Sequence, residues 1–499
     1  MNNPNLSVDT LQRRTSTGGT EETAGISAEV AAGKFRKSPH LIAGAFFTVY
    51  LLLSARRHAA NLSTGYDLGI FTQIVKSYSE LSAPYSPLKG PDYNTLGDHF
   101  HPVLALLAPA YRAFPSSYTL LVCQAALVAF SVIPLMKWAH DVRGRKFAYW
   151  VGVSYGASWG LAKLISFDFH EVAVAVPLLS LSLCAAGRQR WRAALLWSLP
   201  LVLVKEDLGL TVAAIGAYAA WKGPRVAGLA VAAFGAAATA LEMLVILPYF
   251  NPVGKFAYWP APTPEETGLL MQAAEAFWPP VKWLTVLMIV APTGFLALRS
   301  PIVLIALPTL AWRFTSPNPF HWGTDFHYSA VLMPIAFAAA VHTVASGRVT
   351  ARRLVPACVV GAVVTGVTFF THPLHELVLP RTWAESAHVR TADELLAKIP
   401  DGATVAASNQ LAAQLVDRAT VSEICLFPRS FPPSEPPQWL IYDDKDMSDP
   451  DCAAGKAMEA ATPDVPGYRL TDRQDGISLF TRVTDEGQAV SDPGRPDRP

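Results

Sequence analysis

Long apolar runs separated by short charged stretches make up the chain from residue 40 to residue 372. A helix needs about 20 predominantly apolar residues to cross the hydrocarbon core of a bilayer, and the runs reach or approach that length. The pattern predicts a polytopic α-helical membrane protein with about 11 spans, at residues 40–55, 118–139, 147–167, 172–186, 193–204, 208–221, 226–250, 281–298, 302–314, 328–345 and 354–370.

Basic and acidic residues sort to opposite ends of these segments. The basic clusters all fall on one face, at residues 143–146, 188–192, 222–225, 299 and 348–353. By the positive-inside bias that face is cytoplasmic. We therefore expect a multi-pass protein of the plasma membrane, with a cytoplasmic N-terminus and its carboxylate and imidazole groups on the outer face.

Residues 193–221 allow two interpretations. At 1.5 Å per residue this stretch is about 43 Å long, which is too long for one upright span and short for two. Two half-length, re-entrant segments would place the charged triplet Lys205, Glu206 and Asp207 at the outer face. A single tilted helix would place it at the middle of the membrane, where charge is costly, and would move every later loop to the other side.

The two ends of the chain differ from the apolar region. Residues 1–39 and 484–499 lack apolar periodicity and are expected to be disordered tails, the first of them cytoplasmic. Residues 381–483 read as a small soluble α/β domain, expected outside the cytoplasm, with helices at 391–399 and 410–417 and strands at 403–408, 438–442, 468–470 and 478–482. A disulfide between Cys425 and Cys452 is compatible with that location.

Composition excludes two broad classes of function. Hydrophobic residues make up 51% of the chain and charged residues 16%, so the protein is not a single soluble domain. The net charge is +1, which argues against a nucleic-acid partner because such domains present concentrated basic surface. The five cysteines show no spacing typical of a metal site.

The loop that follows the first segment, within residues 56–117, is long for a connector and carries acids and imidazoles. Asp67 lies between Gly65 and Gly69, which permit a close approach to a ligand, and an aspartate there is a candidate general base. The alternative is that Asp67 caps a helix over residues 68–81. Residues 102–114 are too short to span and are expected to lie at the membrane surface.

Three groups of acids and imidazoles recur on the predicted outer face. Each is a candidate for binding a substrate or a divalent metal ion, although interfacial acids and histidines are often simply solvated. The groups are Asp98, His99 and His101, which we consider first for a metal ion; Asp168, His170 and Glu171; and His321, Asp325 and His327.

The charged triplet at 205–207 is costly in an apolar setting unless its members pair with one another or with substrate. Lys205 is a candidate ligand for a phosphate, and Glu206 or Asp207 for orienting it. Aromatic residues on the same predicted face are suited to stacking on sugar rings or to an interfacial belt, namely Tyr249, Phe250, Phe256, Tyr258, Trp259, Phe277, Trp278, Phe320, Trp322, Phe326 and Tyr328.

Four motifs in order resemble a bacterial and archaeal family of predicted membrane proteins known as a domain of unknown function, number 2079. They are Tyr66-Asp67-Leu68-Gly69-Ile70-Phe71, Gly97-Asp98-His99-Phe100-His101-Pro102, Phe167-Asp168-Phe169-His170-Glu171 and Val204-Lys205-Glu206-Asp207-Leu208. The resemblance covers most of residues 41–370, and the soluble segment with Ala406-Ala407-Ser408-Asn409 also looks like that family.

A more distant resemblance links His101-Pro102-Val103-Leu104 and Tyr111-Arg112-Ala113-Phe114-Pro115 to the first-loop pattern of the GT-C membrane glycosyltransferases. It implies a GT-C-like domain over residues 40–372, a polyprenyl-phosphate-linked sugar donor, a cell-envelope acceptor and contact with membrane lipid. By motif position Asp67 matches the first-loop acid. Asp98, Lys205 and Glu206 then join it as catalytic candidates, and the substrate-binding candidates are Tyr66, His99, Asp168, His170, Glu171, Asp207, His321, Asp325, His327 and Tyr328.

Two other functions fit the same pattern. A transporter or lipid-handling protein would use Lys205, Glu206 and Asp207 as a midplane site between broken helices. A non-catalytic surface sensor would use the soluble domain as its receptor. A possible divalent metal ion is the single cofactor expected in any of these readings.

Overall fold

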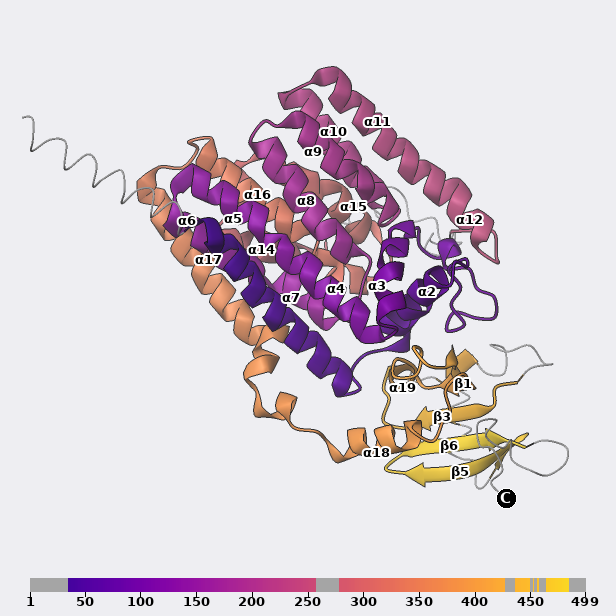
Figure 1. The fold of residues 1–499 in the computed structure, drawn as a ribbon. Helices are drawn as coiled ribbons and strands as arrows, with labels where there is room; N and C mark the ends of the chain where they lie inside the picture. The colour runs from indigo at the N-terminus through magenta and orange to yellow at the C-terminus, as the bar shows by residue number, and fades with distance from the viewer. Residues whose placement is uncertain are drawn as a thin grey trace, which may run out of the picture.

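A helical bundle with a small sheet at one end forms the protein (Figure 1). The computed structural model describes residues 35–256, 278–426, 436–448, 452, 456 and 464–483. Of the tails expected at 1–39 and 484–499, residues 1–34 and 484–499 lie outside the described residues, as do Tyr258, Trp259 and Phe277 of the aromatic set. Residues 35–39 were expected to be disordered, but they form the first turn of the helix Phe35–Ala59. The bundle core is apolar and includes the fully buried rings of Trp138, Trp159 and Phe337.

The helices of the bundle and of its connecting loops have the following bounds. In chain order they are Phe35–Ala59, α2 (Ile70–Ser79), α3 (Ala108–Ala113), α4 (Ser117–Phe130), α5 (Val132–Arg143), α6 (Arg145–Gly156), α7 (Trp159–Ser166), α8 (Val172–Gly187), α9 (Trp191–Ser198), α10 (Leu208–Lys222), α11 (Arg225–Leu241), α12 (Leu247–Phe250), α14 (Pro280–Val290), α15 (Leu307–Thr315), α16 (Leu332–Ala345) and α17 (Ala351–Thr371).

Within the described residues, five helices are long and apolar enough to cross a bilayer, compared with the 11 spans that the sequence predicts. They are Phe35–Ala59, Ser117–Arg143, Arg225–Phe250, His327–Ala345 and Ala351–Thr371. The apolar helices Val172–Gly187, Trp191–Leu203, Pro280–Thr293 and Pro301–Thr315 are shorter than a full span. A multi-helix membrane protein is therefore supported, and the count of 11 is not.

The predicted span over residues 147–167 is two helices rather than one. α6 ends at Gly156 and α7 begins at Trp159. Gly156 packs directly against the ring of Phe46, and its carbonyl oxygen accepts a hydrogen bond from the hydroxyl of Tyr50. A tertiary partner thus satisfies a carbonyl that the helix end leaves open, which sequence periodicity does not reveal.

The helix over residues 193–221 is also interrupted, as one of the two interpretations of the sequence predicted. α9 continues as a 3₁₀ segment, Leu199–Leu203, and α10 begins at Leu208, so the charged triplet lies between the two helices. α10 then packs tightly against α11. A side chain at Gly216 or Gly228 would collide with the backbone of the other helix, so glycine is required for this close approach.

The C-terminal domain is a six-stranded mixed sheet in the order β2-β1-β3-β6-β5-β4. β1 pairs in parallel with β2 and β3, and the remaining pairs are antiparallel. Cys425 and Cys452 form a disulfide in this domain, with Cα atoms 4.9 Å apart. The strands and helices are β1 (Thr404–Ala407), β2 (Thr420–Glu423), β3 (Trp439–Asp443), β4 (Asp464–Val465), β5 (Tyr468–Gln474), β6 (Ile477–Arg482), α18 (Ala387–Leu396) and α19 (Asn409–Ala412).

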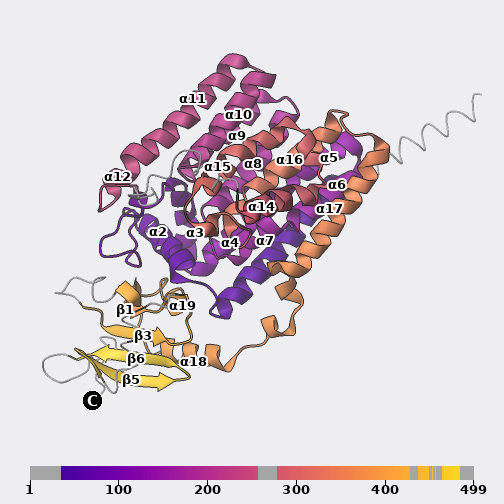
Figure 2. The same cartoon turned by 180° about the vertical axis from the view of Figure 1, so that it is seen from behind.

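This domain contacts the loop that follows the first helix, as the reverse view also shows (Figure 2). Leu88 of that loop is fully buried within the hydrophobic core of the C-terminal domain. Gln73 of α2 donates a hydrogen bond to the carbonyl oxygen of Val421 in β2 (2.8 Å). The loop and the domain therefore share one core, although the sequence predicts them as separate units.

Candidate functional site

Four loops far apart in the sequence meet at the end of the bundle that carries the C-terminal domain. Each follows or precedes a bundle helix, so helix packing brings the loops together. The loops contain residues 61–102, 167–171, 204–207 and 316–328. These are the loops in which the sequence places its acid and imidazole candidates.

Asp67 and His170 form the first pair of the site. Asp67 lies in a π-helical turn, Gly65–Gly69, that precedes α2. Nε2 of His170 lies 3.2 Å from Oδ1 of Asp67, and the hydroxyl of Thr64 donates a hydrogen bond to Oδ2 (2.9 Å). The carboxylate thus contacts side chains from two loops, and the alternative role as a helix cap is not observed because the turn has no side-chain cap.

The imidazole of His170 stacks on that of His327, with ring centroids 3.6 Å apart. Both residues are buried, with 4% and 5% of their surface exposed. The Nδ1 atom of each ring is buried and has no hydrogen-bond partner among the described residues. Buried polar atoms are normally paired, so these two mark a place where a partner is missing.

Asp168 holds the loop that carries Asp67. Its carboxylate accepts a hydrogen bond from the backbone N–H of Thr64 (2.8 Å), and its own backbone is in the left-handed region with φ of 58°. Burial, together with the neighbouring charge of Asp67, raises the pKa of Asp168 to about 6. The strained backbone and the buried carboxylate are both costs that this contact with Thr64 helps to offset.

Two ion pairs fix the charged triplet. Lys205 Nζ lies 2.8 Å from Oε1 of Glu171, and both side chains are largely buried. Glu206 accepts one hydrogen bond from Nδ1 of His99 (2.8 Å) and one from the backbone N–H of Phe100 (3.1 Å). Burial lowers the pKa of His99, but the neighbouring carboxylates of Glu206 and Asp98 outweigh it and raise the pKa overall.

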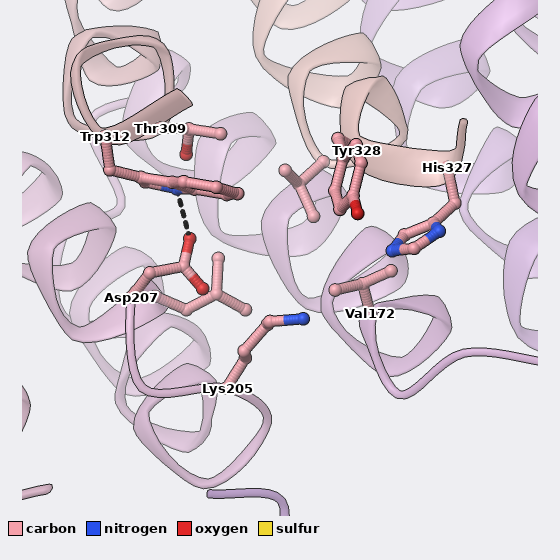
Figure 3. Close-up of a pocket in the computed structure, with 9 residues that line it drawn as sticks. Val172, Lys205, Asp207, Thr309, Trp312, His327 and Tyr328 are labelled. Atoms are coloured by element: carbon pink, nitrogen blue, oxygen red, sulfur yellow. Dashed lines mark hydrogen bonds between the residues drawn. The ribbon is translucent and has the colours of Figure 1, made fainter. Parts of the chain in front are cut away.

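A small cavity opens beside Lys205 (Figure 3). Trp312 and Asp207 form one wall, and His327 and Tyr328 form the opposite wall, with the ammonium group of Lys205 between them. The cavity has a volume of about 20 Å³, which is enough for about one water molecule. A sugar ring would enter it only if the surrounding side chains move apart.

The cavity contains further unpaired polar atoms. The indole N–H of Trp312 donates to Oδ2 of Asp207 (2.8 Å), whereas Oδ1 of Asp207 has no partner among the described residues. The hydroxyl of Thr309 is also unpaired there. A carboxylate oxygen and a hydroxyl are suited to hydrogen bonds with the hydroxyl groups of a ligand.

Other predicted residues lie outside this cluster. Asp98 pairs with Lys89 (2.9 Å), and Asp325 is exposed. Tyr66 is 38% exposed. His321 bonds to Ser316 through Nδ1 (2.7 Å), but its ring also contacts the cavity-wall rings of Trp312 and Tyr328, so it lies at the edge of the cluster. His101 is buried beside Phe71, and burial lowers its pKa to about 4.

The metal ion therefore stays a prediction. Among the described residues, no three His, Cys, Asp or Glu side chains converge in a way that could hold a metal. Asp98, His99 and His101 are adjacent in the chain, but each has a different neighbour: Lys89, Glu206 and Phe71, respectively.

Sequence reasoning missed several residues that build the site. Trp312 forms a cavity wall, and Arg313 is fully buried and donates hydrogen bonds to the carbonyl oxygens of His321 and Gly323 and to the hydroxyl of Ser329. Arg313 thereby ties down the loop that carries His327. The sequence signal that could have identified them is the pair Trp312-Arg313 inside an apolar run. An arginine in such a run is expected to be buried, and a buried arginine requires dedicated partners.

Residues 57–479 match the family of predicted membrane proteins DUF2079, whose function is unknown. The chain belongs to this DUF2079 family. The matched region includes the whole site and most of the C-terminal domain, which confirms the resemblance seen in the four motifs. No curated protein matches this DUF2079 chain.

Proposed function

We propose that this DUF2079 protein is a membrane glycosyltransferase that uses a polyprenyl-phosphate-linked sugar at the extracytoplasmic face. The observation that carries the proposal is the buried cavity in which a lysine, an unpaired carboxylate oxygen and two aromatic rings face one another. This combination suits a sugar phosphate, because its phosphate is anionic and its ring offers hydroxyl groups and an apolar face.

Asp67 is the general base in this proposal. Its side chain is 25% exposed, whereas that of His170 is 5% exposed, so an acceptor hydroxyl reaches Asp67 more readily. The acceptor oxygen forms a bond to the anomeric carbon while the bond from that carbon to the phosphate oxygen breaks. The proton passes to Asp67, and the electron pair leaves with the polyprenyl phosphate.

The sugar of the donor enters the cavity on the other side of the stacked histidines, and this cavity must widen from its volume of about 20 Å³ to admit it. Lys205 compensates the charge that grows on the leaving phosphate, and Glu171 holds the lysine in place. Oδ1 of Asp207 and the hydroxyl of Thr309 bond to sugar hydroxyls, while the rings of Trp312 and Tyr328 flank the sugar. Glu206 and His99 position the adjoining loop.

Two observations support the proposal that the candidate site faces the extracytoplasmic side of the membrane. The C-terminal domain contains a disulfide, which persists in oxidising compartments. The same domain packs on the loop of Asp67, so the site and the disulfide lie on one side of the membrane. The basic turns between α10 and α11 and between α16 and α17 lie at the far end of the bundle (Figure 1).

The test is binding and transfer with purified full-length protein in liposomes that contain a polyprenyl-phosphate-linked sugar. We expect mass spectrometry to find a co-purifying prenyl phosphate, and Lys205→Gln to reduce its retention by at least about tenfold, because a buried charged hydrogen bond is lost. The matched control is Lys89→Gln, a lysine paired with Asp98 outside the cavity. Equal retention by the two variants would refute the donor site.

The broken helix at Lys205 also favours a second candidate, a transporter, because transporters place substrates where spanning helices are interrupted. Counter-flow uptake into the same liposomes separates the two functions. Uptake of labelled substrate without any glycosyl product would favour transport, and product without uptake would favour transfer.

A further inference from the structure

The C-terminal domain reaches the turn that carries Asp67. Oδ1 of Asn409, at the start of α19, accepts a hydrogen bond from the backbone N–H of Tyr66 (2.9 Å). Tyr66 immediately precedes Asp67 in the turn Gly65–Gly69. Asn409 is 3% exposed, so this bond is made in the interior of the interface.

Glycines make this approach possible. A β-carbon at Gly65 would lie 3.0 Å from Cβ of Ala412 and 3.1 Å from Oδ1 of Asn409, which is tighter than ordinary packing. A β-carbon at Gly69 would lie 2.8 Å from a methyl group of Leu88. Both ends of the turn are thus in direct contact with the C-terminal core or with the loop residue buried in it.

Other contacts make the interface continuous. The amide of Gln73 donates to the carbonyl oxygen of Val421, and its carbonyl accepts from the hydroxyl of Ser86 (2.7 Å). Gln414 donates to the carbonyl oxygen of His58 (3.1 Å) at the end of the first helix. The turn of Asp67 therefore sits between the C-terminal domain on one side and His170 of the bundle on the other.

We propose that Asn409 is a positioning residue that holds the turn of Asp67 in the geometry required to meet His170. The C-terminal domain is then part of the catalytic centre rather than an appended receptor. The effect on turnover rests on the proposed function, whereas the effect on the turn does not.

The experiment compares three variants of the full-length protein in detergent or liposomes. Asn409→Leu keeps the size and removes the acceptor, and Asn409→Asp keeps an acceptor oxygen. Gln414→Ala weakens the same interface at His58 without touching the turn. Thermal unfolding of the three proteins first establishes that each is folded.

Hydrogen–deuterium exchange of residues 65–69 is the first readout. Asn409→Leu is expected to raise exchange about tenfold, which corresponds to the loss of one hydrogen bond, whereas Asn409→Asp and Gln414→Ala stay near the parent protein. Equal exchange in all four proteins would overturn the proposal, whether or not the protein transfers sugar.

Transfer kinetics are the second readout. Asn409→Leu is expected to lower kcat by about tenfold or more with the donor KM unchanged, because it displaces the base and not the donor cavity. Asn409→Asp is expected to restore kcat. Faster exchange without a change in kcat would overturn the positioning role, and a parent protein without transfer activity would refute the proposed function while the exchange result still stands.

Discussion

His388 and His170 both contact acidic side chains, but they differ in how many of their ring nitrogens have a partner. This difference distinguishes a structural contact from a candidate binding site. His388 of α18 donates from Nε2 to Asp443 (2.8 Å) and from Nδ1 to Asp475 (2.9 Å), so both of its nitrogens are used. His170 uses Nε2 alone, and its buried Nδ1 has no partner among the described residues. A fully paired histidine fastens elements together, whereas an incompletely paired, buried one leaves room for a ligand.

The charges around the two histidines differ as well. His388 is partly exposed, and Lys445 balances Asp475 beside it. The site in the bundle instead buries Glu171, Glu206 and Lys205 together, with Oδ1 of Asp207 left without a partner. Such burial is costly unless the groups pair with one another or bind a ligand, and Oδ1 of Asp207 has no pair among the described residues. We therefore expect substitutions in the bundle site to lower activity, and substitutions in the His388 cluster to lower stability.

Asp67→Asn is expected to have the largest effect. The amide keeps the shape of the carboxylate but cannot accept the proton, so transfer should fall by at least about a hundredfold, the contribution typical of a general base. The measurement is sugar transfer in liposomes. Asp325→Asn is the control, because this exposed acid lies outside the cluster. Comparable loss in both variants would remove the special role of Asp67.

Trp312→Phe is expected to have an intermediate effect. The ring that flanks the cavity remains, but Asp207 loses its hydrogen bond from the indole and is left a buried carboxylate with fewer partners. Donor KM should rise by about tenfold to a hundredfold, because the loss of a hydrogen bond to a charged group costs about 1.5–3 kcal/mol. Trp383→Phe removes an exposed indole elsewhere and should leave KM unchanged. Equal KM values in the two variants would argue against a sugar at this wall.

His388→Gln is expected to have the smallest effect, and an effect on stability alone. Burial lowers the pKa of His388, but its bonds to Asp443 and Asp475 outweigh it and raise the pKa overall. A raised folded-state pKa stabilises the domain fully below the unfolded value, about 6.5, and the stabilisation is lost as pH rises through the folded value.

The parent protein should therefore unfold more easily at about pH 9 than at about pH 6, and the variant should show a flatter profile. Because the group is partly exposed, we expect a difference under about 1 kcal/mol. Differential scanning fluorimetry across this pH range measures it, with transfer activity as the control. A loss of activity in His388→Gln would contradict the assignment of a purely structural role to His388.

Much of the architecture followed from local patterns. Apolar runs predict the bundle, the change of composition after residue 380 predicts the soluble domain, and the charged triplet predicts the break before α10. These features depend on neighbouring residues in the chain, so a sequence is sufficient to find them. Helix ends fixed by tertiary partners were missed, as at Gly156, where Tyr50 satisfies the carbonyl.

The sequence by itself determined that this is a multi-helix membrane protein of the DUF2079 family, and it identified which residue types carry the candidate chemistry. The tertiary structure alone decided which of them meet. Asp67, His170 and His327 come together while Asp98 and Asp325 do not, although all five lie in similar loops. The physical reason is that pairing of buried polar groups depends on how distant helices pack, and neither periodicity nor local composition encodes that packing.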